Sequence, residues 1–272
     1  MTLKLVNFLS RIMEIKFCKY QGAGNDFIVI DDRDQKLTHL PVADWCHRRT
    51  GIGADGLMLL RPDTDSDFRM IYYNSDGRES TFCGNGGRCL AAFAHQLGLG
   101  KDGLLHFVAM DGPHVAHILN AEYVSLKMNN VSEVKTLSEG YEIQTGSPHY
   151  VSFVEGLQDW NVKEEGARIR NSPAYVQEGI NVNFVEIGGP QSLLVRTYER
   201  GVEDETLSCG TGVTACALAY AQLNQLPWGT YKVDIEAPGG SLQVEFVRNQ
   251  NGFEDVYLKG PAKLVFTGTI VL

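Results

Sequence analysis

A short pattern occurs twice in the chain, and its two copies begin 126 residues apart, at Cys83 and Cys209. The first copy reads Cys83-Gly84-Asn85-Gly86, and the second reads Cys209-Gly210-Thr211-Gly212. Each copy leads into an Ala-rich apolar segment with helical spacing. Chance could produce one such match. Two copies separated by nearly half of the 272 residues predict two related halves, each with one cysteine at a helix start.

The helices behind the two copies are the clearest in the sequence. Arg88 to Leu97 has one apolar face, and Gly98 is placed to end it. A second helix, from about Val213 to Leu223, is apolar nearly all round, which predicts a buried helix. Strand-like alternation is more frequent, as in Ile15/Phe17, Phe68/Met70/Tyr72, Val124/Leu126/Met128, Val233/Ile235, Leu242/Val244/Phe246 and Val256/Leu258. Many strands with few helices, not in strict alternation, predict an α+β fold.

Composition narrows the function classes. The hydrophobic content of 43% and the charged content of 21% are typical of a soluble globular protein. A formal net charge of -9 argues against a nucleic-acid partner, which needs clustered Lys and Arg. No apolar run is long enough to span a bilayer, and no signal-peptide cleavage site is apparent, so we expect no membrane association and a cytoplasmic protein. Residues 1–12 precede the first clean strand pattern and are interpreted as an N-terminal extension.

The six cysteines do not predict disulfides or a metal site. The chain is long, is not rich in cysteine and has no Cys-x-x-Cys pair, so reduced thiols are expected. The histidines have no metal-ligand spacing. The segment from Gly22 to Phe27 lacks the third glycine of a dinucleotide loop, and Gly84 to Gly87 lacks the Lys-Ser/Thr of a P-loop. We therefore expect neither a metal nor a cofactor.

The repeated pattern suits a particular chemistry. A helix N-terminus lowers the pKa of a cysteine and favours negative charge. The glycines beside Asn85 and Thr211 leave room for backbone N–H groups to approach a ligand. Two such helix starts facing each other would hold a carboxylate between Cys83 and Cys209, so that one thiolate removes a proton from Cα and the other thiol returns one to the opposite face. Taken alone, each segment more often contains a buried, inert cysteine than a reactive one. The remaining cysteines are also expected to be structural: Cys18, Cys46, Cys89 and Cys216.

Together with the polar segments around them, these residues resemble the diaminopimelate epimerase family. The resemblance begins near residue 13 and rests on Gly24 to Phe27, Gly51 to Gly56, Asn74 to Cys89 and Glu199 to Gly212. It implies two pseudo-symmetric α/β halves, each a curved, mostly antiparallel sheet around a central helix, with the active site in the cleft between them. The halves would be residues 13–128 with 262–272, and residues 129–261.

The resemblance also implies a reaction and a set of site residues. The reaction is cofactor-independent interconversion of LL- and meso-diaminopimelate, in lysine and peptidoglycan precursor synthesis, with Cys83 and Cys209 as the catalytic pair. Glu199 would face a substrate ammonium, Arg200 would face the distal carboxylate, and His149 would lie beside the cysteines. The other matching positions are Asn25, Asn74, Gly84, Asn85, Asn181, Gly210 and Thr211. A homodimer is common in this family.

The chain departs from the family pattern in two places, and alternative functions stay open. Ser147 stands where the family usually has Asn, and the segment Glu203 to Glu205 replaces a shorter stretch. One alternative is an enzyme similar to proline racemase or hydroxyproline epimerase, although an imino acid has no distal group for Glu199 and Arg200. Another is an isomerase similar to phenazine-biosynthesis proteins, where two helix-start cysteines are not expected. A third is a non-enzymatic binding or thiol redox protein.

Overall fold

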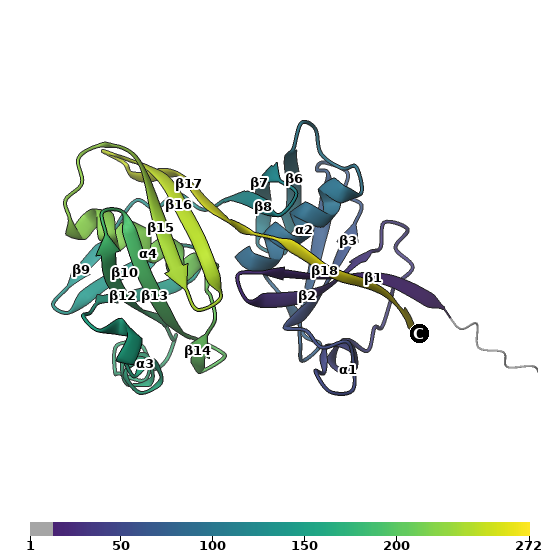
Figure 1. Ribbon diagram of the computed structural model, residues 1–272, viewed down its shortest axis with the longest axis horizontal. Coiled ribbons are helices and arrows are strands. Elements are labelled where there is room, and N and C mark those ends of the chain that lie inside the picture. Colours follow the sequence, from purple (N-terminus) through teal and green to yellow (C-terminus); the bar gives the residue numbers. More distant parts are fainter. Residues whose placement is uncertain (1–12) are drawn as a thin grey trace, which may run out of the picture.

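The computed structural model describes residues 13–272, so the predicted extension at residues 1–12 lies outside the described residues. Residues 13–272 form two lobes whose 18 strands join in one sheet (Figure 1). The first lobe contains β1 (Glu14–Gly22), β2 (Asn25–Asp31), α1 (Val42–Cys46), β3 (Gly56–Arg61), β4 (Phe68–Asn74), β5 (Glu79–Ser80), α2 (Gly84–Gln96), β6 (Leu104–Ala109), β7 (Gly112–Asn120) and β8 (Tyr123–Lys127).

The second lobe follows in the chain. It contains β9 (Lys135–Leu137), β10 (Gly140–Gln144), β11 (Pro148–Phe153), the 3-10 helix η1 (Leu157–Asp159), α3 (Val162–Arg170), β12 (Asn181–Gly189), β13 (Ser192–Glu199), β14 (Asp204–Thr206), α4 (Gly210–Leu223), β15 (Gly229–Ala237), β16 (Gly240–Asn249) and β17 (Gly252–Pro261). The last strand, β18 (Lys263–Val271), pairs antiparallel with β1 of the first lobe.

The two lobes repeat the same order of strands. In the first lobe β2 pairs parallel with β3, and β4 pairs parallel with β6. In the second lobe β11 and β12, and β13 and β15, form the corresponding parallel pairs. The remaining strand pairs are antiparallel, among them β8 with β17, which joins the lobes. The predicted α+β class, with two related and mostly antiparallel halves, is confirmed.

A buried helix lies against the sheet of each lobe and positions the cysteines. Helix α2 begins at Gly84 and α4 begins at Gly210, so Cys83 and Cys209 are the extended residues that cap them. Both helices begin earlier than the apolar spacing predicts, because the glycine-rich first turn contributes no periodic side chains. Gly98 has a φ of 81°, which a glycine adopts without strain, and it follows the end of α2 as predicted.

Two further helices, α1 and α3, are absent from the sequence prediction. Helix α3 begins after Asn161, whose side chain accepts a hydrogen bond from the Glu164 N–H. Gly166 in its middle is unfavourable for a helix, but a Cβ there would lie 2.4 Å from Cβ of Tyr198. Close packing on β13 therefore requires the residue that weakens the helical pattern. No helix within residues 13–272 combines the length and the apolar character needed to cross a membrane.

Candidate active site

A cleft of about 640 Å³ is lined by residues of both lobes. This volume suits a small-molecule ligand. All of the predicted site residues except His149 line it, which brings together Asn25, Asn74, Cys83, Gly84, Asn85, Ser147, Asn181, Glu199, Arg200, Cys209, Gly210 and Thr211. The fold therefore gathers into one cleft residues that lie up to 186 positions apart, from Asn25 to Thr211.

The two helix starts meet at the base of this cleft. A Cβ built on Gly84 would lie 3.9 Å from Cα of Gly210, so the first turns of α2 and α4 are in contact. The second glycine of each pattern has another purpose. A Cβ on Gly86 would lie 1.8 Å from Cε of Met58, and a Cβ on Gly212 would lie 2.4 Å from Oδ1 of Asn183. The first glycine of each pattern lines the cleft where the two helix starts meet, and the second lets the helix pack on its sheet.

The thiols of the two helix starts are harder to ionise than the sequence predicts. Burial raises the pKa of Cys83 to about 11 and that of Cys209 to about 12. Hydrogen bonds from the backbone N–H groups of Asn85 and Gly86 lower the pKa of Cys83, and one from Gly212 lowers the pKa of Cys209. These effects are smaller than the increase caused by desolvation. The nearby Glu199 raises both values further. The helix start therefore lowers each pKa as expected, but burial leaves the net pKa of both thiols above the ordinary value.

His149 reaches Cys209 through Thr211 and does not line the cleft. One ring nitrogen, Nε2, lies 2.9 Å from Oγ1 of Thr211, which in turn lies 3.5 Å from Sγ of Cys209. The other, Nδ1, accepts a hydrogen bond from the amide nitrogen of Asn183. Burial, followed by the positive charge of Arg200, lowers the pKa of His149 to about 3. A neutral ring that accepts at Nδ1 carries its proton on Nε2 and donates it to Thr211.

An acid and a base approach the cleft from the end of β13. Burial raises the pKa of Glu199, although its carboxylate accepts a hydrogen bond of 2.9 Å from the Thr206 hydroxyl. Arg200 donates its backbone N–H to Asn181 and one guanidinium N–H to the Glu178 carbonyl. The segment Glu203 to Glu205, whose path the sequence leaves open, turns back so that β14 pairs with β13. This hairpin places Thr206 beside Glu199.

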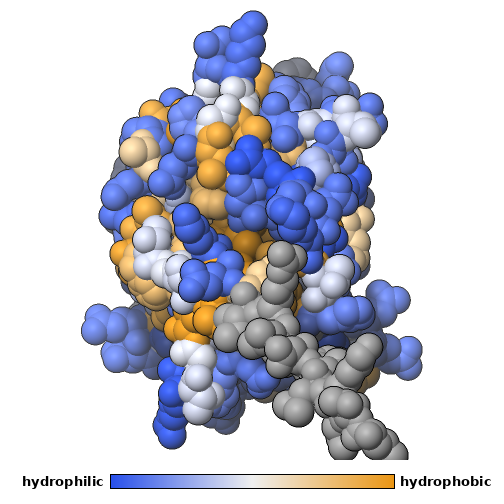
Figure 2. All heavy atoms as spheres, turned by 90° about the vertical axis from the view of Figure 1, so that its right-hand side faces the viewer, coloured by the Kyte–Doolittle hydropathy of each residue, from blue (hydrophilic) through white to orange (hydrophobic). Residues whose placement is uncertain are grey.

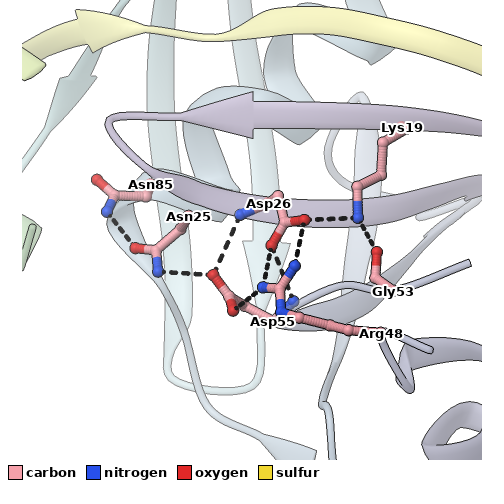
Figure 3. Close-up of polar contacts among 7 residues, drawn as sticks. All are labelled: Lys19, Asn25, Asp26, Arg48, Gly53, Asp55 and Asn85. Carbon is pink, nitrogen blue, oxygen red and sulfur yellow. Dashed lines mark hydrogen bonds and ion pairs between the residues drawn. The ribbon is translucent and has the colours of Figure 1, made fainter. Parts of the chain in front are cut away.

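A hydrogen-bonded network holds the cleft side of the first lobe (Figure 3). The Asn85 amide donates to Oδ1 of Asn25 at 2.6 Å, and the Asn25 amide donates to Oδ2 of Asp55 at 3.0 Å. Arg48 bridges Asp55 and Asp26 with distances of 2.6 and 2.7 Å. Lys19, almost fully buried, contacts Asp26 at 2.7 Å. Lys19 and Arg48 hold the pKa of Asp26 at about 2 against the effect of its burial.

Several other residues line the cleft that the sequence motifs do not identify. The Ser208 hydroxyl is buried and has no hydrogen-bond partner within residues 13–272, which leaves it free for a ligand. Its position directly before Cys209 was the signal that could have identified it. Phe27, Asp55, Tyr72 and Phe82 also line the cleft, and their strand or turn context gave no indication of this.

Comparison with known proteins agrees with this geometry. The model of the family described as diaminopimelate epimerase matches residues 17–134 and again residues 141–265. The chain is 49% identical over 259 residues to the diaminopimelate epimerase of Flavobacterium psychrophilum, covering 94% of this chain and 100% of that protein. It is 44% identical to the diaminopimelate epimerase of Chlorobaculum tepidum, covering 92% of this chain and 99% of that protein.

Solved structures share the fold at low sequence identity. A phenazine biosynthesis protein of Bacillus anthracis matches with a TM-score of 0.75 and 14% identity, covering 96% of this chain and 100% of that chain. A hydroxyproline epimerase of Agrobacterium vitis matches with a TM-score of 0.61 and 15% identity, covering 96% and 92%. These likenesses concern the fold alone, whereas the family match and the close relatives extend over both lobes and both cysteine segments. The chain therefore belongs to the diaminopimelate epimerase family.

Proposed function

We propose that this protein interconverts LL- and meso-diaminopimelate without a cofactor, in lysine and peptidoglycan precursor synthesis. The observation that carries the proposal is that Cys83 and Cys209, from two corresponding helix starts, line one cleft together with Glu199 and Arg200. The relatives at 44–49% identity are named for this activity.

The proposed mechanism uses the two thiols as a pair. One cysteine, as thiolate, takes the Cα proton from one face, and the electron pair of the broken C–H bond passes to Cα and its carboxylate. The opposite thiol then gives its proton to the other face of Cα, so the centre is inverted and the two cysteines exchange protonation states. A thiol of raised pKa is a stronger base once ionised, which suits removal of a weakly acidic proton. The helix-start N–H groups would hold the α-carboxylate as its charge grows.

The remaining cleft residues would hold the rest of the substrate. Diaminopimelate has an amino group and a carboxylate at each end, and all of these charges need partners in a partly closed cleft. In this proposal Glu199 faces a substrate ammonium and Arg200 faces the distal carboxylate. Asn25, Asn74, Asn85, Ser147 and Asn181 supply neutral polar contacts, while His149 acts through Thr211. A substrate without the distal group would leave Arg200 unsatisfied and would be rejected.

Exchange of solvent deuterium tests the reaction directly. Purified protein is incubated with LL-diaminopimelate in D₂O, with reductant and no added cofactor, and the α-carbon is followed for label and stereochemistry. We expect meso product with deuterium at the inverted centre. Cys83→Ser and Cys209→Ser should each lower turnover by about 1000-fold or more while staying folded. Cys89→Ala, which changes a buried thiol of α2 outside the cleft, is the matched control and should retain activity.

A folded, reduced protein that gives neither label nor inversion would contradict the proposal. Proline and hydroxyproline would then be tested in the same assay, because the fold likeness includes a hydroxyproline epimerase. Turnover of either of these, with none of diaminopimelate, would assign the cleft to a monocarboxylate substrate. Turnover of none of them by the wild type would favour a binding or redox role for the two thiols.

We also infer that the protein acts as a homodimer in the cytoplasm. Strand β18 leaves four large apolar side chains exposed: Leu264, Val265, Phe266 and Val271. Figure 2 shows the end of the molecule where β1 and β18 lie, with apolar surface exposed between hydrophilic residues. Exposed large apolar side chains gathered on one strand are a feature of protein interfaces. A reducing compartment keeps the two thiols available, and the net charge of -9 gives no support for nucleic-acid binding.

Sedimentation of the wild type and of Val265→Lys tests the dimer. Val265 is 57% exposed, so a lysine there should leave the fold intact and oppose burial of β18 against a second copy. We expect a dimer for the wild type and a monomer for the variant at the same concentration. Leu194→Lys, at an exposed apolar position of the second lobe, is the control and should stay dimeric. A monomeric wild type, or a variant that sediments like the wild type, would contradict an interface on β18.

A further inference from the structure

Arg88 is a fully buried cation without an acidic partner. Its exposed fraction is 0%, and no ion pair within residues 13–272 involves it. The guanidinium donates instead to three oxygens: Oδ1 of Asn85 at 2.8 Å, the Pro261 carbonyl at 3.4 Å and the Gly84 carbonyl at 3.5 Å. Gly260 allows β17 to pack on it, since a Cβ there would lie 3.1 Å from Cζ of Arg88. Burying an unpaired charge is costly, so the position calls for a source of negative charge.

The oxygens around Arg88 place this charge directly beneath the cleft. Gly84 and Asn85 form the start of α2 and line the cleft. The guanidinium therefore lies behind the helix start that would hold the α-carboxylate. The corresponding residue of α4 is Thr214, five positions after Cys209 as Arg88 is five positions after Cys83. Thr214 is neutral and donates to the Gly210 carbonyl at 2.9 Å, so the position in α4 that corresponds to Arg88 carries no charge.

Arg88 also fixes the direction of the hydrogen-bonded network in Figure 3. A series of hydrogen bonds runs from Arg88 to Asp55. An arginine only donates hydrogen bonds and an ionised aspartate only accepts them, so the direction of donation is fixed at both ends of this series. Arg88 donates a hydrogen bond to Oδ1 of Asn85, so the Asn85 amide nitrogen points toward Asn25. The Asn25 nitrogen is in turn directed to Asp55. The Asn85 amide also donates to the Ser208 carbonyl at 3.3 Å, which ties this network to the residue before Cys209.

Three ionisable groups interact with the guanidinium charge: Cys89 of α2, Cys83 at its N-cap and Tyr123 of β8. Cys89 is fully buried, and burial raises its pKa to about 12. Burial also raises the pKa of Tyr123. Cys83 is the one among them that lines the cleft. Burial is the largest cause of the raised pKa of Cys83, and the positive charge of Arg88 acts to lower it. The guanidinium lies 3.5 Å from the carbonyl of Gly84, the residue next to Cys83.

We propose that Arg88 is a positioning residue that sets an unpaired positive charge beneath the carboxylate-binding end of the cleft and makes Cys83 the thiol that ionises first. The charge would balance the α-carboxylate of the substrate and the thiolate of Cys83, and it would favour the growth of negative charge on that carboxylate when the Cα proton leaves. The part that concerns substrate rests on the proposed function, whereas the order of ionisation does not.

Alkylation of the thiols as a function of pH tests this order without substrate. The wild type and the variants are treated with iodoacetamide between pH 7 and pH 11, and modified peptides are quantified by mass spectrometry. In the wild type we expect Cys83 to react at lower pH than Cys209. Arg88→Gln keeps a donor for Asn85 but removes the charge, so the Cys83 profile should move up by about one pH unit or more while Cys209 stays. Arg88→Lys keeps the charge and should retain the order.

Arg248 provides a matched control. Its guanidinium also binds oxygens without an acid, namely the Ala221 and Leu226 carbonyls and Oε1 of Gln222. Those partners lie at the far end of α4, about 20 Å along the helix from Cys209. Arg248→Gln should therefore leave both thiol profiles unchanged. Thermal unfolding of each variant establishes that it is folded, and Arg88→Met, which fills the site without a charge, replaces Arg88→Gln if that variant does not fold.

The readouts separate failure of this proposal from failure of the proposed function. With diaminopimelate, Arg88→Gln should lower kcat by about 100-fold, with Arg88→Lys closer to the wild type. An unchanged Cys83 profile in folded Arg88→Gln or Arg88→Met would overturn the proposal, whatever the activity. The same shift in Arg88→Lys as in Arg88→Gln would also overturn it, because packing alone would then explain the effect. If the wild type is inactive on diaminopimelate, the proposed function fails, and the alkylation profiles still decide whether the charge of Arg88 favours ionisation of Cys83.

Discussion

At the scale of single residues, the cleft combines groups that oppose ionisation with groups that favour it. Burial and Glu199 raise the pKa of both cysteines, while helix N–H groups lower it. The two thiols are not equivalent, because Cys209 has the Thr211 hydroxyl near its sulfur and Cys83 has the buried charge of Arg88 near it. The repeated sequence pattern places one cysteine at the helix start of each lobe, and the side chains behind each helix start make the two thiols different.

The buried His149 predicts a loss of stability in mild acid. Its folded pKa, about 3, lies below the ordinary value of 6.5, so the unfolded chain binds more protons between these pH values. The free energy of unfolding should therefore fall as pH decreases from about 6.5 toward 3, by up to about 1.4 kcal/mol for each pH unit from this group. Urea unfolding of the wild type and of His149→Gln at pH 7 and pH 5 measures the difference.

His149→Gln should lose less stability between these two pH values than the wild type, even if it is less stable at pH 7. His95, an exposed residue near the end of α2, is the control. His95→Gln should show the same pH dependence as the wild type. Equal pH dependence in His149→Gln and the wild type would show that His149 is protonated or exposed in the folded protein.

At the scale of secondary structure elements, the second glycine of each repeated pattern determines how closely a helix approaches its sheet. An alanine at position 212 would meet Oδ1 of Asn183, and that amide is held by His149, Tyr150 and Thr197. An alanine at position 86 would meet the end of the Met58 side chain, which can move. We expect Gly212→Ala to lower the free energy of unfolding by about 2–3 kcal/mol, and Gly86→Ala to lower it by less.

Denaturant unfolding measures both changes, with Gly98→Ala as the reference. A Cβ at Gly98 would have open space, so that variant carries only the cost of a positive φ, about 1 kcal/mol. If Gly86→Ala proved more destabilising than Gly212→Ala, Met58 and not the Asn183 network would be the rigid neighbour.

The sequence predicts elements well where one local rule dominates. Strict alternation identifies β4, β8, β15, β16 and β17, and the apolar run after each cysteine identifies α2 and α4. Elements whose residues serve a distant contact escape local rules. Gly166 lets α3 pack closely on Tyr198 of β13. Strand β14 follows a turn, and its last residue, Thr206, donates a hydrogen bond to Glu199. The cysteines and most polar cleft residues follow from the motifs, whereas Ser208 and the role of Arg88 depend on contacts between segments that are far apart in the chain.

At the scale of the whole molecule, the cleft exists only because two lobes, each with one reactive thiol, meet at their helix starts. The strand pair β8–β17 connects the lobes and packs on this contact through Leu126 and Leu258, and β18 returns to pair with β1. The Ser208 carbonyl and the Asn85 amide provide a polar link at the cleft itself. The two thiols therefore line one cleft from different lobes, and the relative position of the lobes controls the distance between the two sulfurs.

This arrangement predicts that mild oxidation joins the lobes through a Cys83–Cys209 disulfide. Their neighbours Gly84 and Gly210 are already in contact, and a disulfide needs Cα atoms within about 7 Å. The bond would close a loop of more than a hundred residues, so the free energy of unfolding should rise by up to roughly 5 kcal/mol, less any strain. Activity should be lost and then return with reductant, because the bond removes both the base and the acid. Peptide mapping should find Cys89 and Cys216, which are buried in the helices, still reduced. Oxidised protein that keeps its activity, or a disulfide between other cysteines, would mean that the two sulfurs cannot approach and that the lobes hold them apart.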